Sequence, residues 1–176
     1  MKRSALAAAL ALSVAVSPAA DIDFLTKAKP ATGHSVMGKG EVEFAIPPQQ
    51  ARFIKLEAHG SGDFAAAAAE IRLVGKGGAV VDPKRWKLVG ASGGEATAKS
   101  AYDADPATSW VVPAAPGPHW VAIDLGRVES FSALRYVPAA DGSGAVGPFQ
   151  LFVGHDGKAF DAIASGTLIG GAHGEG

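Results

Sequence analysis

The sequence predicts an all-β domain, a sandwich or barrel of short strands. The clearest strand signal is residues 41–46, where apolar and polar residues alternate strictly and Val42, Phe44 and Ile46 share one face. Turn signals rich in glycine and aspartate separate several stretches of this kind, and no long amphipathic helix competes with them. The 176 residues, 48% hydrophobic and 19% charged, correspond to about one globular domain.

Further strands are expected after the first, which Pro47 and Pro48 should end because proline cannot donate a hydrogen bond to a β-ladder. They are residues 52–58, 70–74, 119–125, 131–137, 149–153 and 160–164. Residues 64–69 are rich in alanine and compete as a helix. Because Gly60 and Gly62 precede them and β-branched residues follow, we expect a short turn that leads into a strand.

The first twenty residues have the pattern of an export signal. Lys2 and Arg3 form a basic start, residues 5–16 are an apolar run, and the small residues over 17–20 suit signal peptidase. We expect cleavage near Ala20 and a secreted or periplasmic location. A membrane anchor is the alternative, but the apolar run is shorter than the roughly 20 residues that span a bilayer. No transmembrane segment is therefore expected after cleavage.

Residues 21–40 carry glycine and proline among polar residues without clear periodicity. They are expected to form a linker or an arm, because such composition does not support a packed element. A β-sandwich is then expected over residues 41–176.

Charge and composition exclude several classes of partner. The formal net charge is −1 and becomes −3 once Lys2 and Arg3 are removed, with both signs interspersed, so nucleic acid is not an expected partner. The chain has no cysteine, which excludes disulfides and thiolate metal sites. It also has no asparagine, which excludes N-glycosylation and removes a side chain often used to bind ligands.

Several segments from Trp86 onward follow the order of a known family. Residues 101–110, Ala-Tyr-Asp-Ala-Asp-Pro-Ala-Thr-Ser-Trp, are similar to its D-x-D-x-x-T-x-W loop. The other segments are Trp86 with Ala91-Ser92, residues 118–126, residues 134–138 with Asp141-Gly142, residues 149–156 and residues 164–167. Together they resemble the discoidin domain, also called the coagulation factor 5/8 type C domain, whose bacterial members include the family-32 carbohydrate-binding modules. The resemblance implies a discoidin-like jelly-roll β-sandwich of the galactose-binding-domain-like kind.

The segment that usually closes this family's domain comes early in this chain, before Trp86. Its counterparts are residues 46–48, 51–56 and 68–71. One explanation is circular permutation, which a fold tolerates when its termini lie close together. It predicts one sandwich, with residues 41–46 near 159–168 and Glu70 near Asp103. The alternative is a remnant of two tandem domains, each incomplete and with unpaired sheet edges.

The resemblance also implies a structural calcium ion in many bacterial members. Asp103, Thr108 and Glu70 are the expected ligands, with Asp105 contributing through its backbone or side chain. Calcium takes six to eight oxygen ligands, which carboxylates, carbonyls and hydroxyls of one loop supply. The alternative is an Asx-type turn, in which Asp103 and Asp105 accept hydrogen bonds from local backbone N–H groups.

Sugar binding needs an aromatic platform and a few fixed polar groups. Phe64, in the loop 60–67, is the aromatic residue that we expect to be exposed, with His59 as its polar neighbour. The tryptophans, Trp86, Trp110 and Trp120, are expected in the core. Sugar-binding members commonly carry an arginine after the proline of the strand that residues 134–138 resemble, whereas this chain has Ala139. Any glycan binding is therefore expected to be weak.

A hydrolase is a distant alternative. Residues 90–94, Gly-Ala-Ser-Gly-Gly, match the G-x-S-x-G pattern, and Asp103 and His119 follow in the chain order of such enzymes. That motif works on a strand-to-helix turn of an α/β sheet, and this sequence lacks the alternating pattern of strands and helices. The five histidines fall at no metal-binding spacing.

The sequence thus favours a secreted, non-catalytic module that recognises a glycan or a protein surface through loops at one end of the sandwich. The alternative is an accessory subunit of an extracytoplasmic assembly, attached through residues 21–40 or an open edge strand. A disordered arm on a monomer would favour the free module, and an arm ordered against another chain would favour the subunit.

Overall fold

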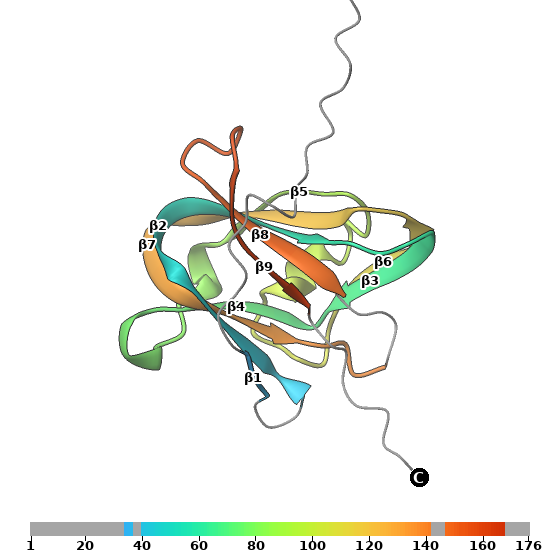
Figure 1. Cartoon of the computed structure of the whole chain (residues 1–176), viewed down its shortest axis with the longest axis horizontal. Coiled ribbons are helices and arrows are strands. Elements are labelled where there is room, and N and C mark those ends of the chain that lie inside the picture. Colours follow the sequence, from blue (N-terminus) through green and yellow to red (C-terminus); the bar gives the residue numbers. More distant parts are fainter. Residues whose placement is uncertain (1–33, 37–39, 142–146, 168–176) are drawn as a thin grey trace, which may run out of the picture.

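The computed structural model describes residues 34–36, 40–141 and 147–167 of the chain (Figure 1). The expected signal peptide and most of the expected arm lie outside the described residues. The strands are β1 (His34–Val36), β2 (Val42–Ala58), β3 (Asp63–Ala68), β4 (Glu70–Val74), β5 (Lys87–Ala91), β6 (Trp110–Pro116), β7 (His119–Val137), β8 (Pro148–Gly154) and β9 (Asp161–Thr167). Short 3₁₀ helices within the described residues include η2 (Lys76–Gly78), η3 (Pro83–Arg85) and η4 (Ala98–Ala101).

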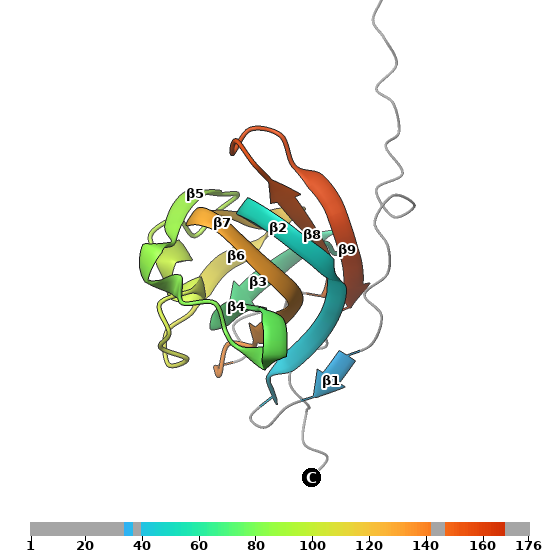
Figure 2. The same ribbon diagram turned by 90° about the vertical axis from the view of Figure 1, so that its left-hand side faces the viewer.

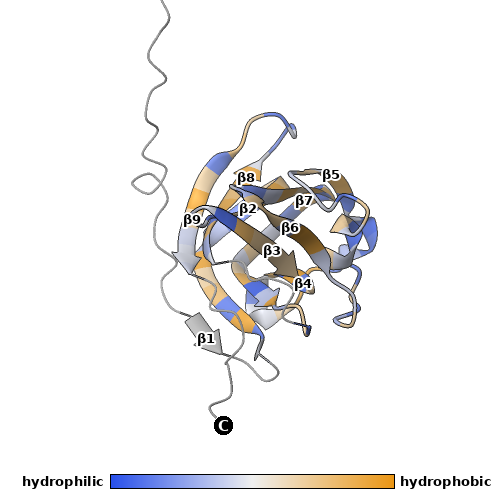
Figure 3. Ribbon diagram, turned by 90° about the vertical axis from the view of Figure 1, so that its right-hand side faces the viewer, coloured by the Kyte–Doolittle hydropathy of each residue, from blue (hydrophilic) through white to orange (hydrophobic). Residues whose placement is uncertain are grey.

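The strands form two antiparallel sheets. The larger has the order β4-β7-β2-β8-β9, with β1 also paired to β2 and β5 also paired to β7. The smaller consists of β3 and β6, and it lies in front of the larger sheet in Figure 3. A buried hydrogen bond joins the sheets, since the hydroxyl of Tyr136 in β7 donates to the carbonyl oxygen of Ala67 in β3 at 2.7 Å. The predicted all-β sandwich is confirmed.

The core lies between the two sheets and follows the alternation of each strand. Ile54 and Leu56 of β2 and Val121 and Ile123 of β7 point into it and are fully buried. The small sheet contributes alanines and the large ring of Trp110. Burial of each large aliphatic side chain stabilises the fold by about 1.5–3 kcal/mol.

In two places, two strands that were predicted separately form one continuous strand in the structure. Residues 42–46 and 52–58 fall in the single strand β2, so the prediction that Pro47 and Pro48 end the first strand was wrong. The register of β2 on β7 shifts between Ala45 and Gln49, and this irregularity accommodates the prolines, which lack an N–H. Residues 119–125 and 131–137 likewise belong to β7, which bends together with β2 (Figure 2).

Strands β1, β3, β5 and β6 were not predicted. The expected turn at residues 64–69 is mostly the strand β3, because Ala66 and Ala68 are 0% exposed and pack in the core opposite β6. Tertiary packing here outweighs the helix propensity of alanine. β1 lies inside the expected arm and pairs with β2, His34 opposite Phe44.

The segments before and after Trp86 form one body. β2 lies between β7 and β8, and β4 pairs with β7, so residues 42–74 are not a separate unit. The ring of Phe44 meets the ring of Phe149 with centroids 5.1 Å apart. This is the single sandwich that circular permutation predicts, with the early strands inserted beside the late ones.

Gly94 and Gly62 give a matched test of the loop geometry. Both have positive φ, but a Cβ at Gly94 would collide with the carbonyl of Val111, whereas a Cβ at Gly62 meets nothing within 4 Å. Gly62→Ala should cost about 1 kcal/mol of unfolding free energy from the backbone conformation alone. Gly94→Ala should cost roughly 3 kcal/mol, because the clash adds to the same strain. Urea denaturation checks this, and equal losses would contradict the local geometry.

Candidate functional site

The loop after η4 folds around two aspartates. The N–H of Asp105 donates to Asp103 Oδ1 at 2.9 Å, and the N–H of Ala107 donates to Asp105 Oδ1 at 3.0 Å. Thr108 Oγ1 donates to Asp103 Oδ2 at 2.8 Å. Ala104 between the aspartates has φ of 68°, in the left-handed region. These are the contacts of consecutive Asx-type turns.

Glu70, the first residue of β4, lies next to this loop and is 1% exposed. Burial raises the pKa of Glu70 to about 7, and the nearby carboxylates of Asp103 and Asp105 also raise it. Arg72 and the backbone N–H of Ala104 oppose this rise. Glu70 Oε1 has no hydrogen-bond partner among the described residues. Glu70 therefore approaches the Asp103 loop, as the permuted sandwich predicted.

The neighbourhood of Glu70 is rich in oxygen atoms. Glu70 and the aspartate loop supply carboxylate, hydroxyl and carbonyl oxygens, which are the atoms that a hard cation prefers. Within the described part of the chain, however, no three His, Cys, Asp or Glu side chains are grouped closely enough to hold a metal ion. The chemistry of the donor atoms fits calcium, but backbone carbonyls and water would have to supply much of its coordination.

Phe64 is half-buried rather than exposed, which corrects the expectation from the sequence. Its ring packs on the ring of His119 with centroids 4.5 Å apart, and His119 Nε2 hydrogen-bonds the Phe64 carbonyl oxygen at 2.8 Å. A side chain at Gly60 or Gly117 would collide with the Phe64 ring. The ring is therefore held between backbone segments and shapes this end of the sandwich.

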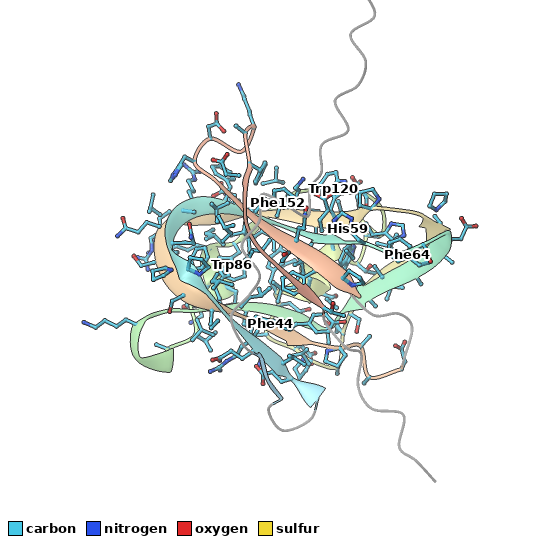
Figure 4. All side chains as sticks on the ribbon, in the orientation of Figure 1. Phe44, His59, Phe64, Trp86, Trp120 and Phe152 are labelled. Atoms are coloured by element: carbon cyan, nitrogen blue, oxygen red, sulfur yellow. The ribbon has the colours of Figure 1, made fainter. Side chains whose placement is uncertain are left out.

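His59 lies at the same end, just after β2 (Figure 4). Its backbone N–H donates to the carbonyl of Pro148 at 2.7 Å, and its side chain is 34% exposed. His59 Nε2 is 3.8 Å from Glu57 Oε1 and has no hydrogen-bond partner among the described residues. The other oxygen of Glu57 is 2.6 Å from Lys55 Nζ. A buried carboxylate thus lies beside His59.

The structure separates the tryptophans into two kinds. Trp86 and Trp110 are 6% and 1% exposed and belong to the core, as expected. Trp120 does not, because the alternation that turns Val121 inward turns Trp120 to the opposite face of β7. It is partly exposed there and lies opposite Glu57 in the register. Sequence reasoning missed this residue, although the inward face of residues 121–125 already indicated it.

The three residues of the hydrolase alternative each form hydrogen bonds with different partners. Ser92 Oγ accepts a hydrogen bond from the Trp120 N–H at 2.8 Å, and His119 is bonded to Phe64. Asp103 accepts hydrogen bonds within its own loop. In the described structure, Ser92, Asp103 and His119 therefore do not have the contacts of a catalytic triad.

Glu70 predicts how the metal-free protein responds to pH. Between about pH 4.5 and pH 7 the unfolded chain has lost a proton that folded Glu70 keeps, so rising pH favours unfolding. With chelator present, this residue should lower the melting temperature by several degrees from about pH 5 to about pH 8. Thermal unfolding of wild type and Glu70→Gln checks this, because the substitution removes the titration. Identical pH dependence in both proteins would rule it out.

A family model of the F5/8 type C domain matches residues 87–175. Such domains are generally non-catalytic binding modules for carbohydrates or proteins and are typically extracellular or secreted. No helix in the described ranges is long and apolar enough to cross a membrane. The match covers half of the chain and includes the Asp103 loop and β5 to β9. This chain therefore belongs to the F5/8 type C, or discoidin, domain family.

Proposed function

We propose that this protein is a secreted or periplasmic, non-catalytic module that recognises a glycan or a protein surface through one end of its sandwich. Its family supports a binding role, and the export pattern of the first twenty residues supports the location. The observation that carries the proposal is the meeting of three chain segments at the end that contains His59. They are residues 59–64, 116–120 and 147–148.

Side chains of two kinds gather at this end. Trp120 offers a partly exposed aromatic face, and its ring packs over Gly90, which has no side chain to displace it. Glu57 and His59 lie beside it and supply a carboxylate and an imidazole. An apolar ring surface next to a few fixed polar groups suits a pyranose or a protein side chain. In this proposal Phe64 and His59 form the site together, Phe64 by fixing the loops and His59 by direct contact.

Two absences limit the affinity for sugars. The chain has no asparagine, and the position where sugar-binding relatives commonly carry an arginine is Ala139, which is buried. One stacking contact contributes on the order of 1 kcal/mol beyond area burial, against the cost of immobilising the ligand. Binding to a simple sugar is therefore proposed to be millimolar at best.

The accessory subunit of the alternative attaches to its assembly through residues 21–40 or through an open edge strand, and only the first of these involves the arm. The last part of the expected arm, His34–Val36, instead pairs with β2 of its own domain. That pairing favours the free module, because this part of the arm is hydrogen-bonded within its own domain rather than to another chain.

The site assignment predicts that Trp120→Ala or His59→Ala lowers ligand affinity about fivefold, the equivalent of roughly 1 kcal/mol for one lost contact. Calorimetry with ligands selected on a glycan array, using the exported protein, measures this. Val128→Ala is the control, because Val128 is exposed in β7 away from His119 and should leave affinity unchanged. Submicromolar binding that survives both substitutions would place the ligand elsewhere.

We further propose a structural calcium ion held by Asp103, Asp105, Thr108 and Glu70. When bound, it would neutralise carboxylates that otherwise repel one another. The nearness of Glu70 to the two aspartates and its unpartnered Oε1 support this.

Calcium that binds only the folded state stabilises it by about 2.7 kcal/mol at a hundredfold excess over the dissociation constant. Chelator should therefore lower the melting temperature by several degrees, and Asp103→Ala should abolish that difference. Asp156→Ala is the matched control, because Asp156 also accepts hydrogen bonds from the backbone N–H groups of a turn, those of Lys158 and Ala159. If chelator changes neither wild type nor Asp103→Ala, the Asx turns alone explain the loop.

A further inference from the structure

A small cavity of about 50 Å³ lies between β4, the segment 80–86 that contains η3, and Ala104 of the aspartate loop. Val80, Val81 and Pro83 form much of its apolar wall. Glu70, Arg72 and Trp86 also line it and carry polar groups. The cavity is therefore mostly apolar, with a few polar atoms at its wall, and is far smaller than the roughly 300–1,000 Å³ of a drug-sized ligand pocket.

Two of its lining residues carry buried polar atoms without a partner. Trp86 Nε1 and Glu70 Oε1 form no hydrogen bond with any described residue, although Trp86 is only 6% exposed and Glu70 only 1%. Such an unpaired group costs about 1–3 kcal/mol, so nearly all buried polar atoms in proteins are paired. Arg72 does not meet this need, because its Nη1 donates to Glu41 and its Nε is 3.9 Å from the other oxygen of Glu70.

The two unpaired atoms have complementary requirements. The indole N–H can only donate, and Glu70 Oε1 only accepts once the carboxyl group is ionised, above its pKa of about 7. The hydroxyl group of an alcohol satisfies both, as a water molecule does, since its oxygen accepts and its proton donates. An ammonium group cannot accept from the indole, and an ether or ketone cannot donate to the carboxylate.

The size of the cavity limits the occupant further. A water molecule takes about 30 Å³ of liquid volume, so about 50 Å³ holds a hydroxyl with roughly one attached carbon. A sugar ring does not fit, but a hydroxymethyl group does. Its methylene would then face the valines and the proline.

We propose that this cavity binds a single primary hydroxyl group, from a small alcohol or from the hydroxymethyl arm of a polyol or sugar. The site is separate from the end of the sandwich that contains His59. It is compatible with calcium on the Asp103 side, because a carboxylate offers about four lone-pair positions.

Nitrogen-15 NMR of the full exported protein tests this proposal, because each tryptophan gives one indole N–H signal. The signal that disappears in Trp86→Phe is the signal of Trp86. Titration with ethylene glycol at about pH 8, where Glu70 is ionised, should shift the Trp86 signal saturably. The Trp110 signal is an internal control, because Trp110 Nε1 already donates to the Gly93 carbonyl at 3.0 Å. Acetone, which accepts but cannot donate, should produce no saturable shift. An unmoved Trp86 signal, or equal linear shifts of all indole signals, would overturn the proposal.

A pair of variants separates the cavity from general solvent effects. Val81→Leu enlarges a wall residue and should abolish the saturable shift, while an unchanged Trp110 signal reports an intact fold. Val89→Leu makes the same change on the exposed surface and should leave the shift intact. A shift that persists in Val81→Leu would place the alcohol outside the cavity. The proposed function is tested separately, by Trp120→Ala and His59→Ala at the other site. Failure of the proposed function and failure of the hydroxyl site can therefore be told apart.

Discussion

The pairing of β2 with β7 is the constraint on which the rest of the structure depends. These strands have 17 and 19 residues, and every other strand of the larger sheet pairs with one of them or with β8, which itself pairs with β2. Strands this long span a domain only by bending, and the register shifts beside Gln49 and Phe53 supply the bends. The bent pair brings β4 to one end of β7 and β5 to the other, and so sets where the sites can form.

Glu70 differs from the aspartates of the neighbouring loop in how its carboxyl group is satisfied. Asp103 and Asp105 satisfy their carboxylates with backbone N–H groups of their own turns, which is inexpensive and local. Glu70 interacts with the backbone N–H of Ala104, but its Oε1 has no hydrogen-bond partner among the described residues, and the core removes it from solvent. Desolvation raises the pKa of Glu70 more than the distant Arg72 lowers it. The carboxylate of Glu70 is therefore left available to a cation, a proton or a hydroxyl group.

Period-two alternation decides which aromatic residues can meet a ligand. Along β7 the inward positions carry Val121 and Ile123, so Trp120 lies on the outer face opposite Glu57. Phe64 sits in a loop-like, glycine-rich stretch of sequence, yet its ring is packed against His119. Trp120 in an apolar strand and Phe64 next to glycines are thus both partly exposed, because the face of the strand matters more than the local composition.

The sequence by itself determined the fold class, most strands of the larger sheet and the family, because alternation and the segments from Trp86 to Thr167 are local patterns. It also indicated that Glu70 would approach Asp103. Only the tertiary structure decided that Pro47 and Pro48 lie inside a strand and that alanines 66–68 are extended, since the partner strand β7 or β6 imposes both. The half-burial of Phe64 and the unpaired Trp86 indole were equally beyond the sequence. Burial and hydrogen-bond partners come from residues far apart in the chain, and no local pattern encodes which of them meet.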